Sequence, residues 1–195
     1  MPKPESLNTP SPAFKEWRVI VEALGAGEQI LILRKGGIAE NRGGFQVEAK
    51  RFWLFPTQFH AQREKTKPAA AGFFQPAAAP ENALTLRFFA DVVHAAFLDR
   101  WDEIARLDDC HLWTEATLRE RFDWGKPPGL HALVVRVHRL REPVTLAVTA
   151  AMSGCKSWIE LPVALDAAAS EPVLDDEAFA ARRRLIAGRM PALGA

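Results

Sequence analysis

The sequence predicts a single α+β domain whose sheet is mixed or mostly antiparallel and can close partly on itself, with helices at its ends. Two observations carry this prediction. Extended apolar segments outnumber segments with good helical spacing, and the two kinds alternate irregularly, without an internal repeat. The chain has 195 residues, of which 48% are hydrophobic and 25% charged, which is enough for one buried core.

Residues 44–60 form the stretch around which we expect the sheet to be built. In a strand over Arg51–Thr57, successive side chains point to opposite faces. Both faces would be apolar, with Phe52 and Leu54 on one and Trp53 and Phe55 on the other. Such a strand is covered on both sides, so it should lie in the interior of the sheet.

Pro56 is expected to end this strand, because proline has no N–H to donate to the ladder. Thr57, Gln58 and His60 would then emerge where a buried strand reaches solvent. Binding residues are often found on loops that a rigid scaffold holds in place. This end of the strand is therefore the first place to look for a site.

Upstream of this stretch we expect a leader, a helix and a strand. Residues 1–11 are polar and rich in proline, which is typical of a disordered leader. Apolar residues at helical spacing predict a helix over 14–24, with a strand over 17–23 as the alternative because of its β-branched residues. The apolar residues 29–34 predict a short strand.

Downstream, residues 61–82 are dominated by Ala, Pro, Gln and Lys, which predicts a mobile surface loop or a lid over the site. A long strand is expected over 84–98, bent by a bulge near Ala90 and Asp91, and a helix over 88–98 is its competitor. Strands are also expected over 130–140 and Trp158–Leu161, with Pro143 marking a turn or a sheet edge before a short strand or extended segment over 144–148.

Three helices complete the predicted domain. Asp99 can cap a short helix over 101–107. Thr114 can cap a helix over 114–122, with Trp113 packing on Leu118 as a hydrophobic staple. We therefore divide the chain into a leader, one domain over 12–165, and a tail over 166–195 with an amphipathic helix at 175–190.

The charges balance overall but not locally. The net charge of +1 gives no global attraction to nucleic acid or to a membrane. Residues 34–65 contain seven Lys or Arg and three Glu, and residues 119–141 contain six Lys or Arg and two acids. Such a local excess can give a neutral protein a basic face. No apolar run reaches the length of a membrane-spanning helix and no signal peptide is visible, so we expect a cytoplasmic protein without membrane association.

The motifs do not assemble a complete catalytic set, and the sequence leans away from an enzyme. Glu48-Ala49-Lys50 has the Glu-x-Lys form of one group of metal-dependent nucleases, with Glu40 or Glu28 as a further carboxylate for Mg²⁺. Lys35-Gly36-Gly37 lacks the spacing of a phosphate-binding loop and predicts a turn.

Cysteine and histidine do not point to a metal or a cofactor. The two cysteines, Cys110 and Cys155, are too few for a disulfide framework. The five histidines do not stand at ligand spacings, so we expect no structural zinc and no cofactor. Cys155 beside Lys156 could be a reactive thiol, but no His or Asn partner is evident.

Tryptophans beside basic residues give the best hint of function. The chain has six tryptophans and no tyrosine, and aromatic rings next to cations can stack bases while the cations take phosphates. This requires the tryptophan-rich strand and the late turn at Cys155 and Lys156 to be neighbours. The predicted nucleic-acid-binding residues are Arg34, Lys35, Arg51, Trp53, Thr57, His60, Lys156 and Trp158.

Six runs of sequence resemble a bacterial family known only as a domain of unknown function. They are F-K-E-W-x-V-x-V-E-A-L from Phe14, L-R-K-G-G-I-x-E from Leu33, F-Q-V-E from Phe45, F-W-L-F-P-T from Phe52, H-L-W-T from His111 and G-C-K-S-W-I-E-L from Gly154. Some members are similar to proteins found with Mrr-like restriction endonuclease domains, which implies a role around DNA in restriction, modification or defence. Lys50 is not fixed in the family, which counts against the Glu-x-Lys interpretation.

The order of the elements also resembles the ASCH and PUA-like barrels, which bind RNA or modified bases. The likeness is one of architecture, and architecture alone does not transfer function. We therefore expect a cytoplasmic module that binds DNA or RNA. The alternatives are a Mg²⁺-dependent nuclease at Glu40, Glu48 and Lys50, or a protein-interaction module in a restriction or defence system.

Overall fold

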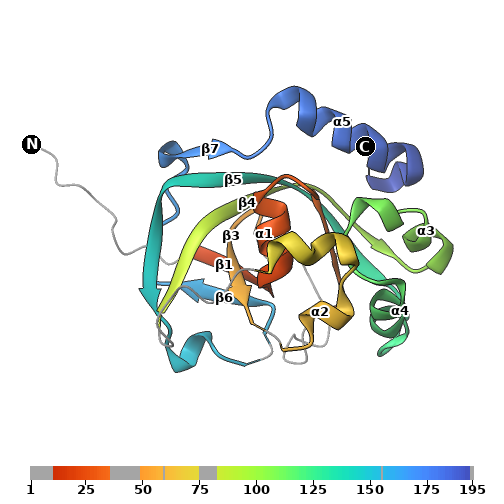
Figure 1. Ribbon diagram of the computed structural model, residues 1–195, viewed down its shortest axis with the longest axis horizontal. Helices are drawn as coiled ribbons and strands as arrows, with labels where there is room; N and C mark the ends of the chain where they lie inside the picture. The colour runs from red at the N-terminus through yellow and green to blue at the C-terminus, as the bar shows by residue number, and fades with distance from the viewer. Residues whose placement is uncertain (1–10, 36–48, 59, 75–82, 155, 194–195) are drawn as a thin grey trace, which may run out of the picture.

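A computed structural model describes residues 11–35, 49–58, 60–74, 83–154 and 156–193 (Figure 1). The described strands form one sheet in the order β2-β5-β4-β3-β1-β6, with β7 paired to β5. The strands are β1 Ser11–Trp17, β2 Leu31–Arg34, β3 Arg51–Thr57, β4 Ala83–Leu98, β5 Leu130–Ala147, β6 Trp158–Leu161 and β7 Ser170–Pro172. The α-helices are α1 Arg18–Gly25, α2 Gln62–Lys65, α3 Trp101–Ala105, α4 Glu115–Asp123 and α5 Asp176–Arg189.

The sheet is mixed and mostly antiparallel, as predicted. Among the described strands, β1 and β3 form the parallel pair, and every other pairing is antiparallel. The long strands β4 and β5 arch over the other strands, so the sheet curls into a half-barrel with helices around it (Figure 1). The pairing of β4 with β5 shifts register between Leu86 and Phe88 and again between Val92 and His94, just beyond the expected bulge.

Strand β3 is the interior strand that its sequence predicts. It pairs with β1 on one side and with β4 on the other. Phe52 and Leu54 belong to the main core cluster, while Trp53 and Phe55 belong to a second cluster on the opposite face. All four side chains are buried, so both faces of the strand are covered.

Pro56 does not end β3, which is a correction to the expectation. The parallel pairing with β1 continues through Glu16–Pro56 to Trp17–Thr57. Strand β4 pairs with β3 only over residues 51–53, so the side of β3 that faces β4 carries no ladder at Pro56. A residue without an N–H is tolerated where one side of the strand needs no donor.

The expected helix over 14–24 and its alternative, a strand over 17–23, are both wrong in their bounds. Residues up to Trp17 form β1, and the helix α1 begins at Arg18. Strand β1 lies between β3 and β6, so sheet pairing on both sides overrides the helical spacing of its apolar residues. Local pattern could not reveal those partners.

Residues 60–74 contain more regular structure than the loop predicted over 61–82, whose remaining residues lie outside the described ranges. They contain α2 and a 3₁₀ helix over Pro68–Phe73. Ala70 is fully buried, and Thr66 forms an isolated bridge with Trp113. Composition assigns this alanine-rich stretch to a loop, but its 3₁₀ helix packs near α1 with Ala70 in the main core cluster.

Of the predictions for the helix ends and the later strands, some are confirmed and others are wrong. Thr114 caps α4 as predicted, because its Oγ1 accepts a hydrogen bond from the backbone N–H of Thr117 at 3.3 Å. Asp99 does not cap α3, since Arg100 occupies that position without a side-chain bond. Strand β5 runs through Pro143 without the expected turn.

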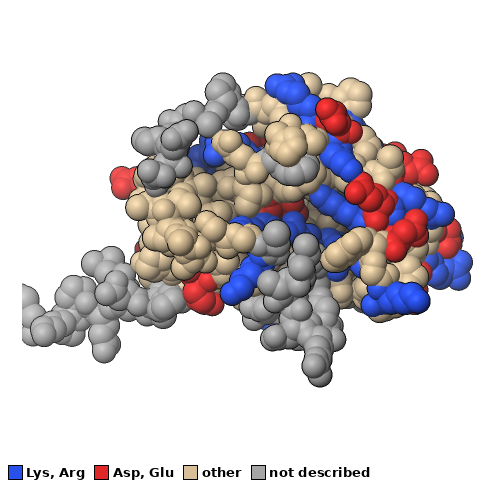
Figure 2. Space-filling model, turned by 90° about the horizontal axis from the view of Figure 1, so that it is seen from below, with Lys and Arg blue, Asp and Glu red and all other residues tan. Residues whose placement is uncertain are grey.

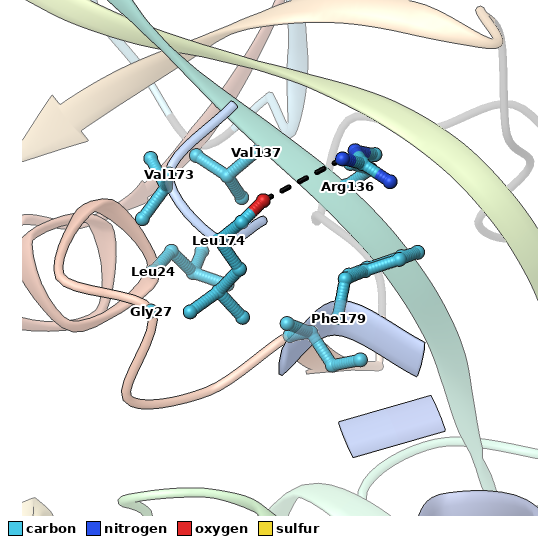
Figure 3. Close-up of a pocket in the computed structure, with 8 residues that line it drawn as sticks. Leu24, Gly27, Arg136, Val137, Val173, Leu174 and Phe179 are labelled. Carbon is cyan, nitrogen blue, oxygen red and sulfur yellow. Dashed lines mark hydrogen bonds between the residues drawn. The ribbon is translucent and has the colours of Figure 1, made fainter. Parts of the chain in front are cut away.

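Residues after β6 pack against the barrel through α5. Phe179 and Ile186 of this helix are buried in the main core cluster. Figure 3 shows a small apolar pocket between Leu24, Val137 and Phe179, where Arg136 donates to the backbone carbonyl of Leu174 at 3.5 Å. Within the described residues, no helix is long and apolar enough to cross a membrane.

Candidate functional site

A buried carboxylate lies at the end of β1. The side chain of Glu16 is fully buried, and its Oε1 accepts hydrogen bonds from the backbone N–H of Trp17 at 2.7 Å and from Nη1 of Arg34 at 3.3 Å. Its Oε2 is buried and has no hydrogen-bond partner among the described residues. Burying a carboxylate is costly unless its charge and both oxygens are satisfied. The site is built around this group.

Arg34 provides the counter-charge from the end of β2. Besides its ion pair with Glu16, its Nη2 donates to Oγ of Ser157 at 3.4 Å, just before β6. Its guanidinium lies over the ring of Phe14, 5.3 Å from the ring centre. Arg34 therefore connects three segments that are far apart in the sequence.

A second guanidinium comes from α4. Arg121 lies over the ring of Trp113 at 3.8 Å and over that of Trp17 at 5.1 Å. Burial lowers the pKa of Arg121 to about 10, and the negative charge of Glu16 opposes that shift. The side chain remains protonated at neutral pH, and its buried Nη1 has no hydrogen-bond partner among the described residues.

Two tryptophans complete this group of side chains. The rings of Trp17 and Trp113 meet edge to face, with centroids 4.8 Å apart. The indole Nε1 of Trp113 is buried and has no hydrogen-bond partner in the part of the chain that the structure describes. We call Glu16, Trp17, Arg34, Trp113 and Arg121 the charged cluster.

The backbone around the charged cluster is held by hydrogen bonds from β3 and α2. Thr57 Oγ1 donates to the carbonyl of Glu16 at 3.1 Å. Gln62 donates through Nε2 to the carbonyl of Thr57 at 3.2 Å and accepts at Oε1 from the N–H of Val19 at 3.3 Å. These bonds fix the point where β1 turns into α1, so the position of Glu16 is set by a rigid frame.

The elements that carry the charged cluster border one face of the molecule. Helix α4 and the end of β3 lie toward the lower side of Figure 1. Seen from that side, the surface is hollowed, and Lys and Arg side chains gather in and around the hollow with a few acidic ones among them (Figure 2). Several cations on α2 and α4 are ion-paired, Lys65 with Glu120 and Arg119 with Asp123, so this side carries Lys and Arg interleaved with acids.

Two of the predicted cations are occupied by other groups. Lys35 donates from Nζ to the carbonyls of Phe122, Pro127 and Gly129 at 3.3, 2.7 and 3.1 Å. Burial lowers the pKa of Lys35, with Asp123 opposing. Arg51 makes two hydrogen bonds to Asp91, at 2.6 and 2.8 Å, which raise its pKa.

The two tryptophans expected to stack bases are in the core, which corrects that expectation. Trp53 is 1% exposed and packs in the second core cluster. Trp158 is 7% exposed and lies between the rings of Phe14 and Phe52, with centroids 5.0 and 4.9 Å away. A ring enclosed by other rings has no free face for a base.

The remaining predicted residues are divided between surface and undescribed segments. His60 and Lys156 are exposed, as is Lys50 of the alternative nuclease set. Glu40, Glu48 and Cys155 lie outside the described residues. No group of three metal-ligating side chains occurs in the ranges that the structure describes.

The end of β3 and the turn before β6 both contact β1, which lies between them. Trp17 pairs with Thr57 of β3, and Phe14 pairs with Trp158 of β6. The backbone N–H of Lys15 donates to the carbonyl of Ser157 at 2.8 Å, and its Nζ donates to the carbonyls of Met152 and Gly154 at 3.0 and 2.6 Å. Of the predicted residues, Arg34 and Thr57 contact Glu16 directly.

Sequence reasoning missed Glu16, Trp17, Trp113 and Arg121 as site residues. A signal was available in the six runs quoted above. The run from Phe14 contains Glu16 and Trp17, the run from Leu33 contains Arg34, and the run from His111 contains Trp113. These separate runs meet in the charged cluster, which no single run could indicate.

The fold and site define an α+β half-barrel with a buried, charged cluster at one end. The chain belongs to the family described as Domain of unknown function (DUF1802), whose model matches residues 13–185. No curated protein matches the sequence.

Among solved structures, the chain is similar to the crystal structure of ASCH from Zymomonas mobilis. The TM-score is 0.44 and the sequence identity 13%, over 77% of this chain and 86% of that one. This similarity says nothing about what the chain binds.

Proposed function

We propose that the protein binds single-stranded DNA or RNA through this hollowed face, with an unstacked base meeting the charged cluster at Trp17, its partly exposed ring. The observation that carries this proposal is that fully buried Glu16 and nearby Arg121, whose charges act on each other, each have one buried polar atom without a hydrogen-bond partner among the described residues. Buried polar groups without partners are rare in folded proteins and often mark a place that water or a ligand occupies.

The surrounding chemistry favours a nucleotide over other small ligands. Trp17 is a partly exposed aromatic neighbour of Arg121, with fully buried Trp113 packed against both, and aromatic rings and guanidinium planes are the usual stacking partners of unpaired bases. The Lys and Arg side chains around the hollow would take the phosphates of the flanking nucleotides (Figure 2). Exposed Lys156, next to Ser157 and thus close to Arg34, is one such cation.

The proposal gives structural roles to several residues that the sequence predicts to bind nucleic acid. Lys35, Trp53 and Trp158 become structural, since their side chains are bonded to carbonyls or enclosed in the core. Arg34 and Thr57 position Glu16 and do not contact phosphate. A link to restriction or defence stays a prediction, because the family carries no assigned activity.

The test is fluorescence anisotropy with labelled single-stranded and double-stranded DNA and RNA, over a series of salt concentrations. We expect the single strands to bind more tightly and the affinity to fall as salt rises, because phosphate contacts release counterions. Replacing Arg121 by Met should weaken binding by at least about tenfold, since a stacking and hydrogen-bonding group is lost.

Arg119→Met is the matched control for Arg121→Met. Arg119 lies on the same helix and carries the same charge, but it is exposed and lies over Trp101 at 4.5 Å instead of the charged cluster. Circular dichroism and thermal melting would show that both variants fold. Equal effects of the two substitutions, or no binding of any nucleic acid at low salt, would refute the proposal.

A further inference from the structure

Trp124 is the large apolar side chain that the described part of the chain leaves most open to solvent. It is 54% exposed and stands directly after the last residue of α4. Tryptophan is highly buried on average in folded proteins, because its ring carries a large apolar surface. Exposure alone does not define a site, since single apolar side chains on a surface are common. The position of Trp124 is what makes its exposure informative.

Trp124 lies one helical turn beyond Arg121 of the charged cluster. Its backbone N–H donates to the carbonyl of Glu120 at 3.1 Å, so the helical geometry of α4 extends to this residue. Residues three apart in a helix are neighbours on its surface, with Cβ atoms about 5–6 Å apart. The guanidinium of Arg121 in turn lies 5.1 Å from the ring centre of Trp17. Trp17 and Trp124 are therefore both neighbours of one arginine.

The backbone that carries Trp124 is held in place. The N–H of Gly129 donates to the carbonyl of Phe122 at 3.0 Å, which closes the loop over residues 122–129. Gly125 has a φ of 70°, a conformation that glycine adopts without strain, and it turns the chain directly after the tryptophan. A ligand that contacts a ring on such a loop does not have to order the backbone first.

The charges beside Trp124 favour a partner that carries phosphate. Lys126 is exposed and lies two residues further along the same loop. The two nearest acids in the chain, Glu120 and Asp123, each form an ion pair with a Lys or Arg side chain. Lys126 therefore adds a positive charge beside the ring, where phosphates of a nucleic-acid strand are attracted.

The small size of this apolar surface favours a nucleotide base over a protein. Stable protein interfaces bury about 800 Å² on each partner around an apolar centre. The neighbours of Trp124 in the chain are Asp123, Gly125 and Lys126, which are charged or small. One exposed ring is enough to stack a single base, because every base has a π-face.

We infer that Trp124 stacks a second base of a bound single strand and that Lys126 contacts a phosphate beside it. This inference rests on the proposed function and deepens it, because the binding surface then runs from Trp17 past Arg121 to Trp124. Stacking on one ring involves no hydrogen bonds to base edges, so this position accepts all four bases.

The experiment measures fluorescence anisotropy at low salt with labelled oligothymidine of about 12 nucleotides and with an abasic strand of the same length. Trp124→Leu should weaken binding of oligothymidine by about tenfold and leave binding of the abasic strand unchanged, because leucine is apolar but has no ring. Trp124→Phe keeps a ring, so its affinity for oligothymidine should stay within about threefold of wild type.

Two further variants complete the test. Lys126→Met should weaken binding of both strands alike and lower the slope of log affinity against log salt by about 0.7, the value for one phosphate contact on a single strand. Leu185→Ala is the control for loss of an exposed apolar side chain. Leu185 is 42% exposed on α5, which lies on the upper side of Figure 1, away from α4, and its loss should change neither affinity.

The outcomes separate this inference from the proposed function. Wild-type affinity of Trp124→Leu for oligothymidine would overturn the inference and leave the proposed function intact, as would equal weakening by Leu and Phe or equal loss on the two strands. A wild-type dimer that Trp124→Leu dissociates, seen by sedimentation, would assign the ring to a contact between two copies instead. If wild type bound no strand, the proposed function would itself fall, and this inference with it.

Discussion

Nη1 of Arg34 lies 3.3 Å from Oε1 of Glu16, and this ion pair joins the two ends of the sheet. Arg34 ends β2, the first strand in the spatial order, while Glu16 belongs to β1, which lies beside the last strand, β6. The carboxylate is fully buried and Arg34 is 18% exposed. A pair that replaces backbone pairing at the closure of a barrel should have a large effect on stability.

Arg34→Met should lower the free energy of unfolding by about 3 kcal/mol, because it leaves a buried carboxylate without its nearest counter-charge. Glu16→Gln should cost less, since the amide can still accept from Trp17. Urea unfolding of the two single variants and the double variant gives the coupling energy. A double variant whose loss equals the sum of the two single losses would show that the pair is not coupled.

Stability should fall in mild acid because of His111. Its ring is buried, its Nδ1 accepts from the N–H of Trp113 at 3.2 Å, and burial lowers its pKa from 6.5 to about 4. As pH falls from 6.5 toward 4, His111 becomes protonated in the unfolded chain but stays neutral in the folded chain. Stability is therefore complete above pH 6.5 and declines by about 3 kcal/mol by pH 4.

The pH effect of His111 is measured by urea unfolding at several values between those limits. His111→Gln removes the titrating ring, so the difference between wild type and variant isolates its contribution from those of other groups. That difference should narrow as pH is lowered. A difference that stays constant from neutral pH to pH 4 would mean that the ring is already protonated or is not buried.

Lys35→Met should destabilise the fold by about 1–2 kcal/mol without weakening nucleic-acid binding, because Nζ is bonded to three carbonyls, one in the last turn of α4 and two after it. Lys156→Met should do the opposite, since Lys156 is exposed. Urea unfolding and anisotropy on both variants check the pair. Loss of binding in a stable Lys35→Met protein would reinstate Lys35 as a phosphate ligand.

Replacing two helix glycines by alanine should change the stability of the protein in opposite directions. A Cβ at Gly25 would lie 2.2 Å from the buried ring of Phe88, so Gly25→Ala should cost about 1–3 kcal/mol. A Cβ at Gly188 in α5 would meet nothing within 4 Å, so Gly188→Ala should stabilise by about 0.5–1 kcal/mol through helix propensity. Thermal melting compares the two, and stabilisation by Gly25→Ala would contradict the packing described here.

The parts of the fold that sequence predicts well are those decided by local pattern. Strand β3 is interior because every residue from Phe52 to Phe55 is apolar, and no partner needs to be known to see this. The cap at Thr114 follows from a hydroxyl that precedes a helix. Both predictions depend on neighbours in the chain.

The parts that sequence predicts poorly depend on distant partners. Residues 14–17 have helical spacing but pair with β3 and β6. Glu16 looks like an ordinary surface carboxylate, but it is fully buried and paired with Arg34 from β2, a partner that local pattern does not reveal. The sequence places Trp53 and Trp158 beside cations, but the rings that enclose them, such as Phe89 and Phe52, come from other strands.

The closure of the barrel by side chains has a mechanical consequence. In the described structure β2 and β6 are the end strands of the sheet and do not pair with each other. Arg34 at the end of β2 hydrogen-bonds to Ser157, just before β6, and so bridges these two unpaired edges. Arg34 lies over the ring of Phe14, which packs against Phe52 and Trp158. We therefore expect loss of the Arg34 contacts to let water reach this aromatic interior at a lower temperature.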